Sequence, residues 1–250
     1  MAYLSYPEQT LLAADVDGSN AHRLTSGAMC GFLPQWSPDG RRVAFMSHRC
    51  GENVLTRIRI VSPDGRDPVE PVPVRGWQGA PNWTSDSELV FGDDGPTFPI
   101  PATCSLHVFD FKTGKVADLP GTRGLWSARP CPTGRYIAAQ TNDKRKLMLY
   151  DRTTAELTEL FSSPEGTLGD NPTWSRDGAY IYMATPYARD PAVYRIRIAD
   201  RQRERVDSLK GIQRVVENIG VWMGLTPGES LLILRQVEGS EIESWDWVAP

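Results

Sequence analysis

Aspartates that recur at regular spacing are the first candidates for chemistry in this 250-residue chain. Asp39, Asp86 and Asp177 each stand third in a turn that begins with serine or threonine. A carboxylate there could move a proton or bind a cation, but it can also accept backbone N–H groups within its own turn. Because the same position is filled in several turns, we interpret these aspartates as structural. The same reasoning covers the aspartates that end successive strand-like runs: Asp15, Asp110, Asp151 and Asp200.

The segment Asp15-Val16-Asp17-Gly18-Ser19-Asn20 resembles the start of a calcium-binding loop. A loop of that kind needs further oxygen ligands and a glutamate at its twelfth position. The twelfth residue here is Ser26. We therefore predict a hairpin turn at this place and expect no bound metal.

Cysteine and histidine offer the second set of candidates. The chain has four cysteines and three histidines: Cys30, Cys50, Cys104, Cys131, His22, His48 and His107. No two cysteines have the Cys-x-x-Cys spacing of a structural zinc site, so we expect neither a zinc ion nor another cofactor. Cys30 and Cys50 would lie nearly opposite each other if a hairpin turns near residues 38–39. A disulfide and two free thiols are both compatible with that placement, and we favour free thiols.

A serine nucleophile is not indicated either. The chain contains no Gly-x-Ser-x-Gly elbow, and the segment Gly228-Glu229-Ser230 falls at one of the repeated turns described next. We expect no catalytic residues and favour a binding protein over an enzyme.

The elements that would position any of these side chains belong to a repeat. Five segments each join a short apolar approach, a turn and a β-rich run: 33–45, 80–91, 128–139, 171–182 and 221–233. Aligned on Trp36, the equivalent positions follow at intervals of 47, 47, 44 and 51 residues. A period in the forties is typical of one four-stranded blade of a β-propeller. The tryptophans at this position, Trp36, Trp83 and Trp174, are predicted to pack between neighbouring blades.

Each unit continues with further strands. Second strands are predicted at 42–47, 88–93, 136–141, 180–185 and 231–236, and third strands at 57–62, 106–110, 147–151, 194–200 and 242–247. The segment 67–74 contains three prolines, which cannot donate to a ladder, so we predict an outer edge strand there. The chain begins in a second strand at 2–6 and ends near a third. We predict an all-β propeller of about six four-stranded blades, either complete with two short blades or the last part of a longer propeller.

Three segments resemble the TolB-like propeller repeat: PQWSPDGRRVAF, TWSRDGAYIYM and LLAADVDGSNAHRLT. The resemblance covers essentially the whole chain and weakens at 131–134 and 226–229. The whole arrangement is also similar to the C-terminal propellers of bacterial regulators, in which a winged-helix or kinase domain and a membrane segment come first. This implies a periplasmic or extracytoplasmic sensor that binds a protein or peptide. Lyases of similar fold hold a metal with several histidines, and we do not expect the three histidines here to converge.

Composition agrees with a single globular domain over 1–250. The formal net charge is -4 and charged residues make up 23%, with no basic patch that would indicate nucleic-acid binding. No apolar run is long enough to insert in a membrane, and no signal peptide is visible. We expect a monomer.

A ligand would meet the loops that enter the innermost strands, because function in such folds resides on loops. These loops are 25–32, 74–81, 121–128, 162–171 and 211–220, and an insertion at 91–105 projects beside them. Aromatic and arginine side chains dominate binding hot spots. The candidate partner-binding residues are Arg75, Trp77, Arg123, Trp126, Asp170 and Glu217. The alternative function is a carbohydrate-binding or lyase- or hydrolase-type propeller acting at the channel mouth.

Overall fold

The computed structural model describes residues 1–5, 8–25, 27–51, 56–66, 68, 71–74, 76–93, 101–163, 165–169, 171–213, 222–237 and 239–245. These residues form β-strands and turns, with no helix among them. The chain divides into two compact units, Met1–Pro130 and Cys131–Pro250. Each unit is described separately, and the single domain over 1–250 stays a prediction.

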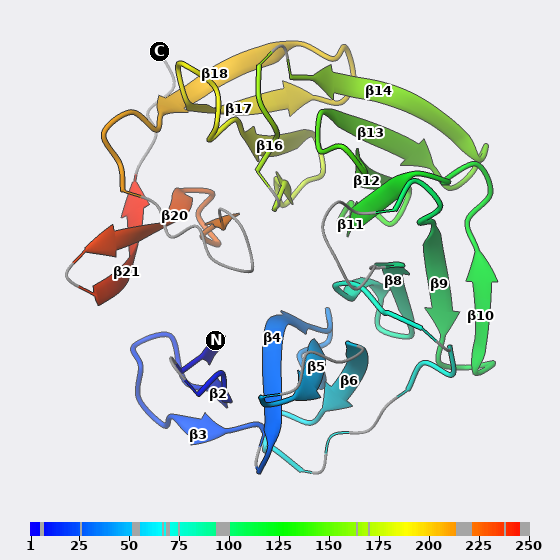
Figure 1. Ribbon diagram of the computed structural model, residues 1–250, viewed down its shortest axis with the longest axis vertical. Helices are drawn as coiled ribbons and strands as arrows, with labels where there is room; N and C mark the ends of the chain where they lie inside the picture. The colour runs from blue at the N-terminus through cyan, green and yellow to red at the C-terminus, as the bar shows by residue number, and fades with distance from the viewer. Residues whose placement is uncertain are drawn as a thin grey trace. The chain divides into compact units, whose positions relative to one another are not determined.

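The first unit contains three antiparallel sheets, with strand orders β1-β2-β3, β4-β5-β6 and β10-β9-β8-β7, followed by β11 (Figure 1). Their bounds are Ala2–Leu4 (β1), Leu11–Ala13 (β2), His22–Arg23 (β3), Met29–Trp36 (β4), Val43–Arg49 (β5), Arg57–Val61 (β6), Asn82–Ser85 (β7), Glu88–Gly92 (β8), Leu106–Asp110 (β9), Lys115–Asp118 (β10) and Leu125–Pro130 (β11). The predicted second strand at 88–93 and third strand at 106–110 are confirmed to within one residue.

The second unit follows the same plan. Its hydrogen-bonded neighbours run β12-β13-β14, β15-β16-β17-β18 and β19-β20-β21. Their bounds are Tyr136–Thr141 (β12), Lys146–Asp151 (β13), Glu156–Ser162 (β14), Thr173–Trp174 (β15), Tyr180–Ala184 (β16), Ala192–Arg197 (β17), Arg203–Ser208 (β18), Met223–Leu225 (β19), Leu231–Val237 (β20) and Gly239–Trp245 (β21).

Four of the five described turns between first and second strands keep one backbone bond, even where the sequence pattern weakens. In 37–40, 131–134, 175–178 and 226–229, the N–H of the fourth residue donates to the first carbonyl at 2.8–2.9 Å. The second and fourth of these ranges lack the Ser-x-Asp-Gly pattern or keep only part of it. The turn geometry is therefore more regular than the residue types that form it.

The recurring aspartates are structural, as predicted. Asp39 accepts the Ser37 hydroxyl at 2.5 Å and the Arg41 N–H at 3.0 Å. These hydrogen bonds, the serine bond first, lower the pKa of Asp39. Asp110 and Asp151 likewise accept the N–H two residues further on, at 2.7 and 2.8 Å.

The repeated tryptophans do not share one environment. Trp83 is 9% exposed, and its indole N–H donates to the carbonyl of Gln35 at 3.0 Å, in the neighbouring sheet. Trp174 is also 9% exposed, whereas Trp36 is 37% exposed. Packing between blades is thus confirmed for Trp83, and Trp36 departs from the predicted pattern.

Apolar side chains fill the space between neighbouring sheets within each unit. In the first unit, Phe45 and Val43 of β5 pack with Leu11 of β2, and Phe91 of β8 packs with Ile58 of β6. In the second unit, one such cluster joins Cys131, Ala138, Leu147, Trp174 and Ile181. Alternating strand positions supply these residues, because successive side chains point to opposite faces of a sheet.

The outer edge strand predicted at 67–74 is wrong for the residues that the structure describes there. Pro68 and residues 71–74 are not assigned to a strand. No ladder joins the described residues of this segment to β6. Side chains bind its carbonyls instead, as the next subsection describes.

Candidate functional site

The entry loop that carries Trp77 is fixed by one buried side chain. Gln78 is 0% exposed, and its amide oxygen accepts the N–H of Ile58 in β6 at 2.7 Å. Its amide nitrogen donates to the carbonyls of Val72 and Val74 at 3.2 and 3.1 Å. The side chain of Gln78 therefore links the proline-rich segment to β6. It also fixes the backbone beside Trp77, whose side chain is half-buried.

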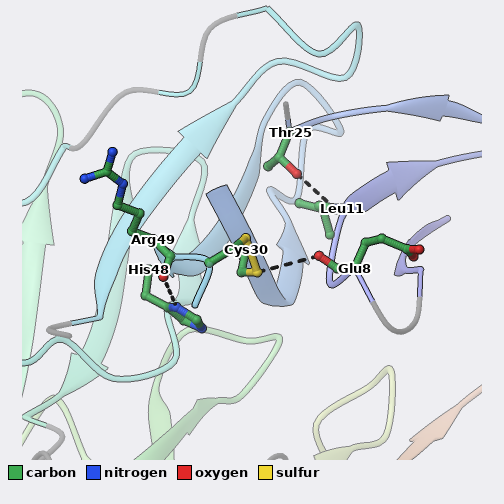
Figure 2. Close-up of a disulfide and its surroundings, with 7 residues drawn as sticks. Glu8, Leu11, Thr25, Cys30, His48 and Arg49 are labelled. Carbon is green, nitrogen blue, oxygen red and sulfur yellow. Dashed lines mark hydrogen bonds between the residues drawn. A yellow bond between two sulfur atoms is a disulfide. The ribbon is translucent and has the colours of Figure 1, made fainter. Parts of the chain in front are cut away.

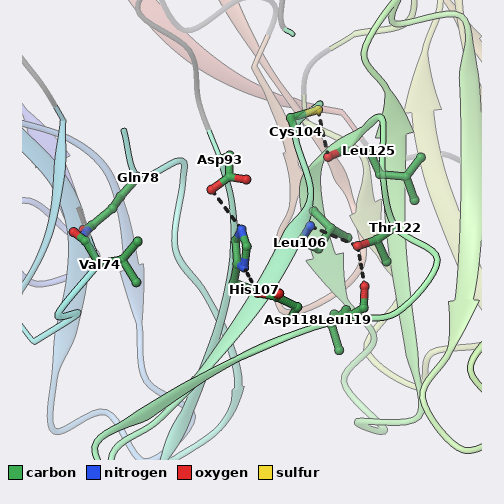
Figure 3. Close-up of polar contacts among 10 residues, drawn as sticks. All are labelled: Val74, Gln78, Asp93, Cys104, Leu106, His107, Asp118, Leu119, Thr122 and Leu125. Atoms are coloured by element: carbon green, nitrogen blue, oxygen red, sulfur yellow. Dashed lines mark hydrogen bonds and ion pairs between the residues drawn. The ribbon is translucent and has the colours of Figure 1, made fainter. Parts of the chain in front are cut away.

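The entry loop that carries Arg123 and Trp126 is fixed in an equivalent way. The Thr122 hydroxyl accepts the N–H of Leu106, the first residue of β9, at 3.1 Å and donates to the carbonyl of Leu119 at 2.7 Å (Figure 3). Thr122 is 1% exposed. Next to this anchor, Arg123 is exposed and Trp126 is half-buried.

The same device is present in the N-terminal sheet. The N–H of Leu11, the first residue of β2, donates to the Thr25 hydroxyl at 3.0 Å (Figure 2). Thr25, Gln78 and Thr122 thus each accept the N–H of the first or second residue of a third strand. Sequence reasoning missed this set because two residue types perform the same role at unequal spacing.

The two anchored loops meet at the end of β8. The Gly79 N–H donates to the carbonyl of Gly92 at 2.8 Å. A β-carbon at Gly92 would lie 3.7 Å from the α-carbon of Trp126. Trp77 and Arg123 therefore lie in two loops, and Trp126 near the start of β11, around one strand end. We call these three residues the entry-loop face.

A bridged histidine lies at the same strand end and was not among the predicted site residues. His107 Nε2 is 2.9 Å from a carboxylate oxygen of Asp93, and Nδ1 is 2.8 Å from one of Asp118 (Figure 3). The His107 side chain is 14% exposed, against 41% for Asp93 and 83% for Asp118. The hydrogen bond to Asp93 raises the pKa of His107, an effect that outweighs the desolvation of the imidazolium.

The three histidines do not converge within the first unit. His22 contacts the carbonyls of Asn20 and Pro63, His48 contacts that of Arg49, and both nitrogens of His107 face carboxylates. Within the described part of the chain, no group of three or more His, Cys, Asp or Glu side chains is arranged to hold a metal ion.

A disulfide joins Cys30 and Cys50, so the expectation of two free thiols is wrong (Figure 2). Their α-carbons are 5.0 Å apart. The Cys50 N–H donates to the carbonyl of Ala28 at 2.7 Å, which holds the residue after β5 against the residues before β4. Cys104 and Cys131 are buried and take part in no disulfide among the described residues.

The other predicted site residues lie outside the described residues. These are Arg75, Asp170 and Glu217, and residues 94–100 of the insertion at 91–105 lie there as well. Their participation in a binding face stays a prediction. The described residues also contain no helix of the length and apolar character that crossing a membrane requires.

Comparison with known proteins shows that this chain resembles several solved structures in fold. No family model matches the chain, and no curated protein matches it. Among solved structures, TolB from Acinetobacter baumannii superposes with a TM-score of 0.66 over 90% of this chain at 18% identity. Putative TolB from Agrobacterium tumefaciens gives a TM-score of 0.66 over 96% of this chain and 84% of its own, at 14% identity. The fold is a TolB-like β-propeller.

Enzymes share this likeness. An oligogalacturonate lyase in complex with manganese superposes with a TM-score of 0.68 at 14% identity, over 96% of this chain and 74% of its own. The present chain spans 57% of the length of the Acinetobacter TolB. Sequence identities of 14–18% support the propeller fold and do not establish an activity.

Proposed function

We propose that this propeller is a non-catalytic domain that binds a protein or peptide through the entry-loop face. The observation that carries the proposal is the pair of anchored loops around Gly92. Buried hydrogen bonds from Gln78 and Thr122 fix both loops, so the face is ordered before a partner arrives. A preordered face loses less conformational entropy when it binds.

The chemistry of the face favours a polypeptide partner. Trp77 and Trp126 are half-buried and Arg123 is exposed. Tryptophan supplies a large apolar area with few rotamers to lose, and arginine supplies several N–H donors on a rigid planar group. Both residue types are enriched in protein hot spots.

We further propose an extracytoplasmic location, as the sensor end of a bacterial membrane-linked regulator. The Cys30–Cys50 disulfide supports the location, because disulfides persist mainly in oxidising compartments. The resemblance of the repeat to the propellers of such regulators supports the role.

Site-specific photo-crosslinking tests the proposed face. A photoreactive phenylalanine replaces Arg123 in one variant and Arg41 in the control. Arg41 is also exposed but lies in the turn between β4 and β5. We expect a discrete crosslinked protein or peptide from position 123 alone.

The Trp77→Ala/Trp126→Ala double variant, checked for folding by circular dichroism, should lower the affinity for that species at least tenfold. Equal crosslinking at both positions, or an unchanged affinity, would refute the proposal.

A further inference from the structure

His107 lies between the hydrogen bonds that fix the two entry loops. Its ring contacts Asp93 at the end of β8 and Asp118 in β10 (Figure 3). Asp93 directly follows Gly92, whose carbonyl accepts the N–H of Gly79 in the first anchored loop. The histidine therefore contacts a residue that adjoins the bond holding this loop.

The other carboxylate adjoins the anchor of the second loop. Asp118 directly precedes Leu119, whose carbonyl accepts the Thr122 hydroxyl at 2.7 Å. Leu119 also donates its N–H to the carbonyl of Leu106, the chain neighbour of His107, at 2.9 Å. Each carboxylate that His107 contacts is thus one residue from a hydrogen bond that fixes an entry loop.

The two contacts together require a doubly protonated ring. The nitrogens of His107 lie 2.9 and 2.8 Å from their carboxylate oxygens. Imidazolium has an N–H on each nitrogen, whereas neutral imidazole has one N–H and presents a lone pair at the other nitrogen. In either neutral tautomer, one carboxylate therefore faces a lone pair. The ring is 14% exposed and packs beside Phe91, so the more exposed carboxylates are the groups that move.

The other described groups that face the ring do not change charge near neutral pH. His107 shares a sheet face with Phe91, its partner in β8. This face packs against Ile58 of β6 and against the proline-rich segment, whose described residues carry no titratable side chain. Arg57 and Arg59 flank Ile58 and so begin on the opposite face of β6, and arginine stays charged. Histidine is therefore the group here that titrates near neutral pH.

Comparison across the first unit shows that the anchors do not need a histidine. The residue after the anchored N–H is Leu12 in β2, Arg59 in β6 and His107 in β9. Leucine does not titrate, and arginine keeps its charge. The same kind of anchor is thus made twice without a titratable neighbour, so the N-terminal anchor supplies a control within the same molecule.

We propose that His107 is a pH-dependent switch that orders the entry-loop face, so that a partner binds more tightly at mildly acidic pH than at alkaline pH. The inference rests on the entry-loop face proposed above and adds its regulation. Protonated His107 holds both carboxylates and so the ends of β8 and β10. Loss of the proton releases one carboxylate, the adjoining anchor opens more often, and the loop loses the preorder that favours binding.

The direction of the pKa shift agrees with this geometry. The contact with Asp93 raises the pKa of His107 above the ordinary histidine value of about 6.5. The ordered form is therefore present at mildly acidic pH and is lost as pH rises through the raised pKa.

Amide hydrogen exchange on the complete chain tests the switch without a partner. The N–H groups of Gly79 and Leu106 report on the two loops, and that of Leu11, which binds Thr25, is the matched control. Protection is corrected for the intrinsic effect of pH on exchange. Relative to Leu11, the protection of Gly79 or Leu106 should fall about threefold to tenfold between about pH 6 and pH 8.5. The amide that loses protection identifies the carboxylate that is released.

Four variants make this measurement specific. His107→Phe should abolish the pH dependence at both loops. Asp93→Asn and Asp118→Asn should each abolish it at the adjoining loop, because an amide can accept an N–H or donate to a lone pair. Asp110→Asn, at the other end of β9, should leave it unchanged. Constant relative protection in the wild type, or the same pH dependence in His107→Phe, would overturn the proposal.

Binding of the polypeptide captured at position 123 separates the switch from the proposed function. Its affinity for the complete chain should fall about threefold to tenfold over the same pH range, with a slope of at most one decade per pH unit because one proton is linked. In His107→Phe the affinity should be constant. Equal affinities of the wild type at both pH values would overturn the regulation. If no polypeptide is captured at either pH, the entry-loop face is refuted, and the exchange result still confirms or refutes the ordering of the loops.

Discussion

Replacing His107 by phenylalanine should lower the stability of the first unit at mildly acidic pH and have little effect at alkaline pH. Phenylalanine keeps a ring beside Phe91, whose centroid lies 5.4 Å from that of His107, but it cannot donate to Asp93 or Asp118. The perturbation therefore removes two charge-assisted contacts and little packing.

The expected magnitude follows from the exposure of the three groups. A hydrogen bond to a charged group contributes about 1.5–3 kcal/mol when it is shielded. Asp93 is 41% exposed and Asp118 is 83% exposed, so solvent reduces both contacts, and the second contributes under about 1 kcal/mol. We expect a loss of about 1–2 kcal/mol in the free energy of unfolding near pH 5.5.

The sign of the pH dependence follows from the direction of the pKa shift. The folded protein raises the pKa of His107 above the ordinary histidine value of about 6.5. The stabilisation is therefore fully present below the unfolded pKa and is lost as pH rises through the folded pKa. A neutral imidazole has one N–H for two carboxylates, so the difference between wild type and variant should be small near pH 9.

Urea unfolding of both proteins from pH 5.5 to pH 9 measures this difference, and NMR titration of the imidazole measures the folded pKa. The two measurements must agree. The change with pH in the stability difference between the two proteins should equal about 1.4 kcal/mol for each unit by which folding shifts the pKa of His107. His48→Phe is the control, because His48 contacts only the carbonyl of Arg49 among its described hydrogen-bond partners. A destabilisation that is constant with pH, or larger at pH 9, would refute the argument.

Three further substitutions test the elements that hold the loops and turns. Gln78→Ala removes three buried hydrogen bonds and should lower the free energy of unfolding by about 2–4 kcal/mol in urea. Replacing Cys30 and Cys50 by serine opens a loop with a sequence separation of 20 and should lower it by about 3 kcal/mol, as should reduction of the wild type. Gly178→Ala should lower the melting temperature more than Gly40→Ala. Both glycines have a φ near +70°, but a β-carbon at Gly178 would lie 2.5 Å from a buried sulfur, whereas none lies within 4 Å at Gly40.

The strands were predictable from the sequence because they depend on patterns that repeat. β9 coincides with the predicted range 106–110, and the first-to-second-strand turns recur even where the pattern weakens. The segment 67–74 was not predictable in the same way. Its prolines indicated an edge strand, but the described residues there form no strand, and their carbonyls bind the side chain of Gln78, which belongs to the following loop.

The candidate site was less predictable, for a physical reason. Trp77, Arg123 and Trp126 could be proposed from residue type, but their common location depends on the bonds of Gly79 and Thr122. The bridge from His107 to two carboxylates depends on strand register, and neither residue spacing nor composition indicates it. Contacts of this kind join positions whose separations differ from one unit to the next.

Comparison of environments across the repeat separates structural from functional residues better than comparison of residue types. Thr25, Gln78 and Thr122 differ in type and share one environment, so substitutions among them that keep the hydrogen bond should be tolerated. Trp36 and Trp83 share a type and differ in environment. Burial and a hydrogen bond to Gln35 therefore give Trp83 a packing role, which the repeated residue type alone does not give to Trp36 at 37% exposed.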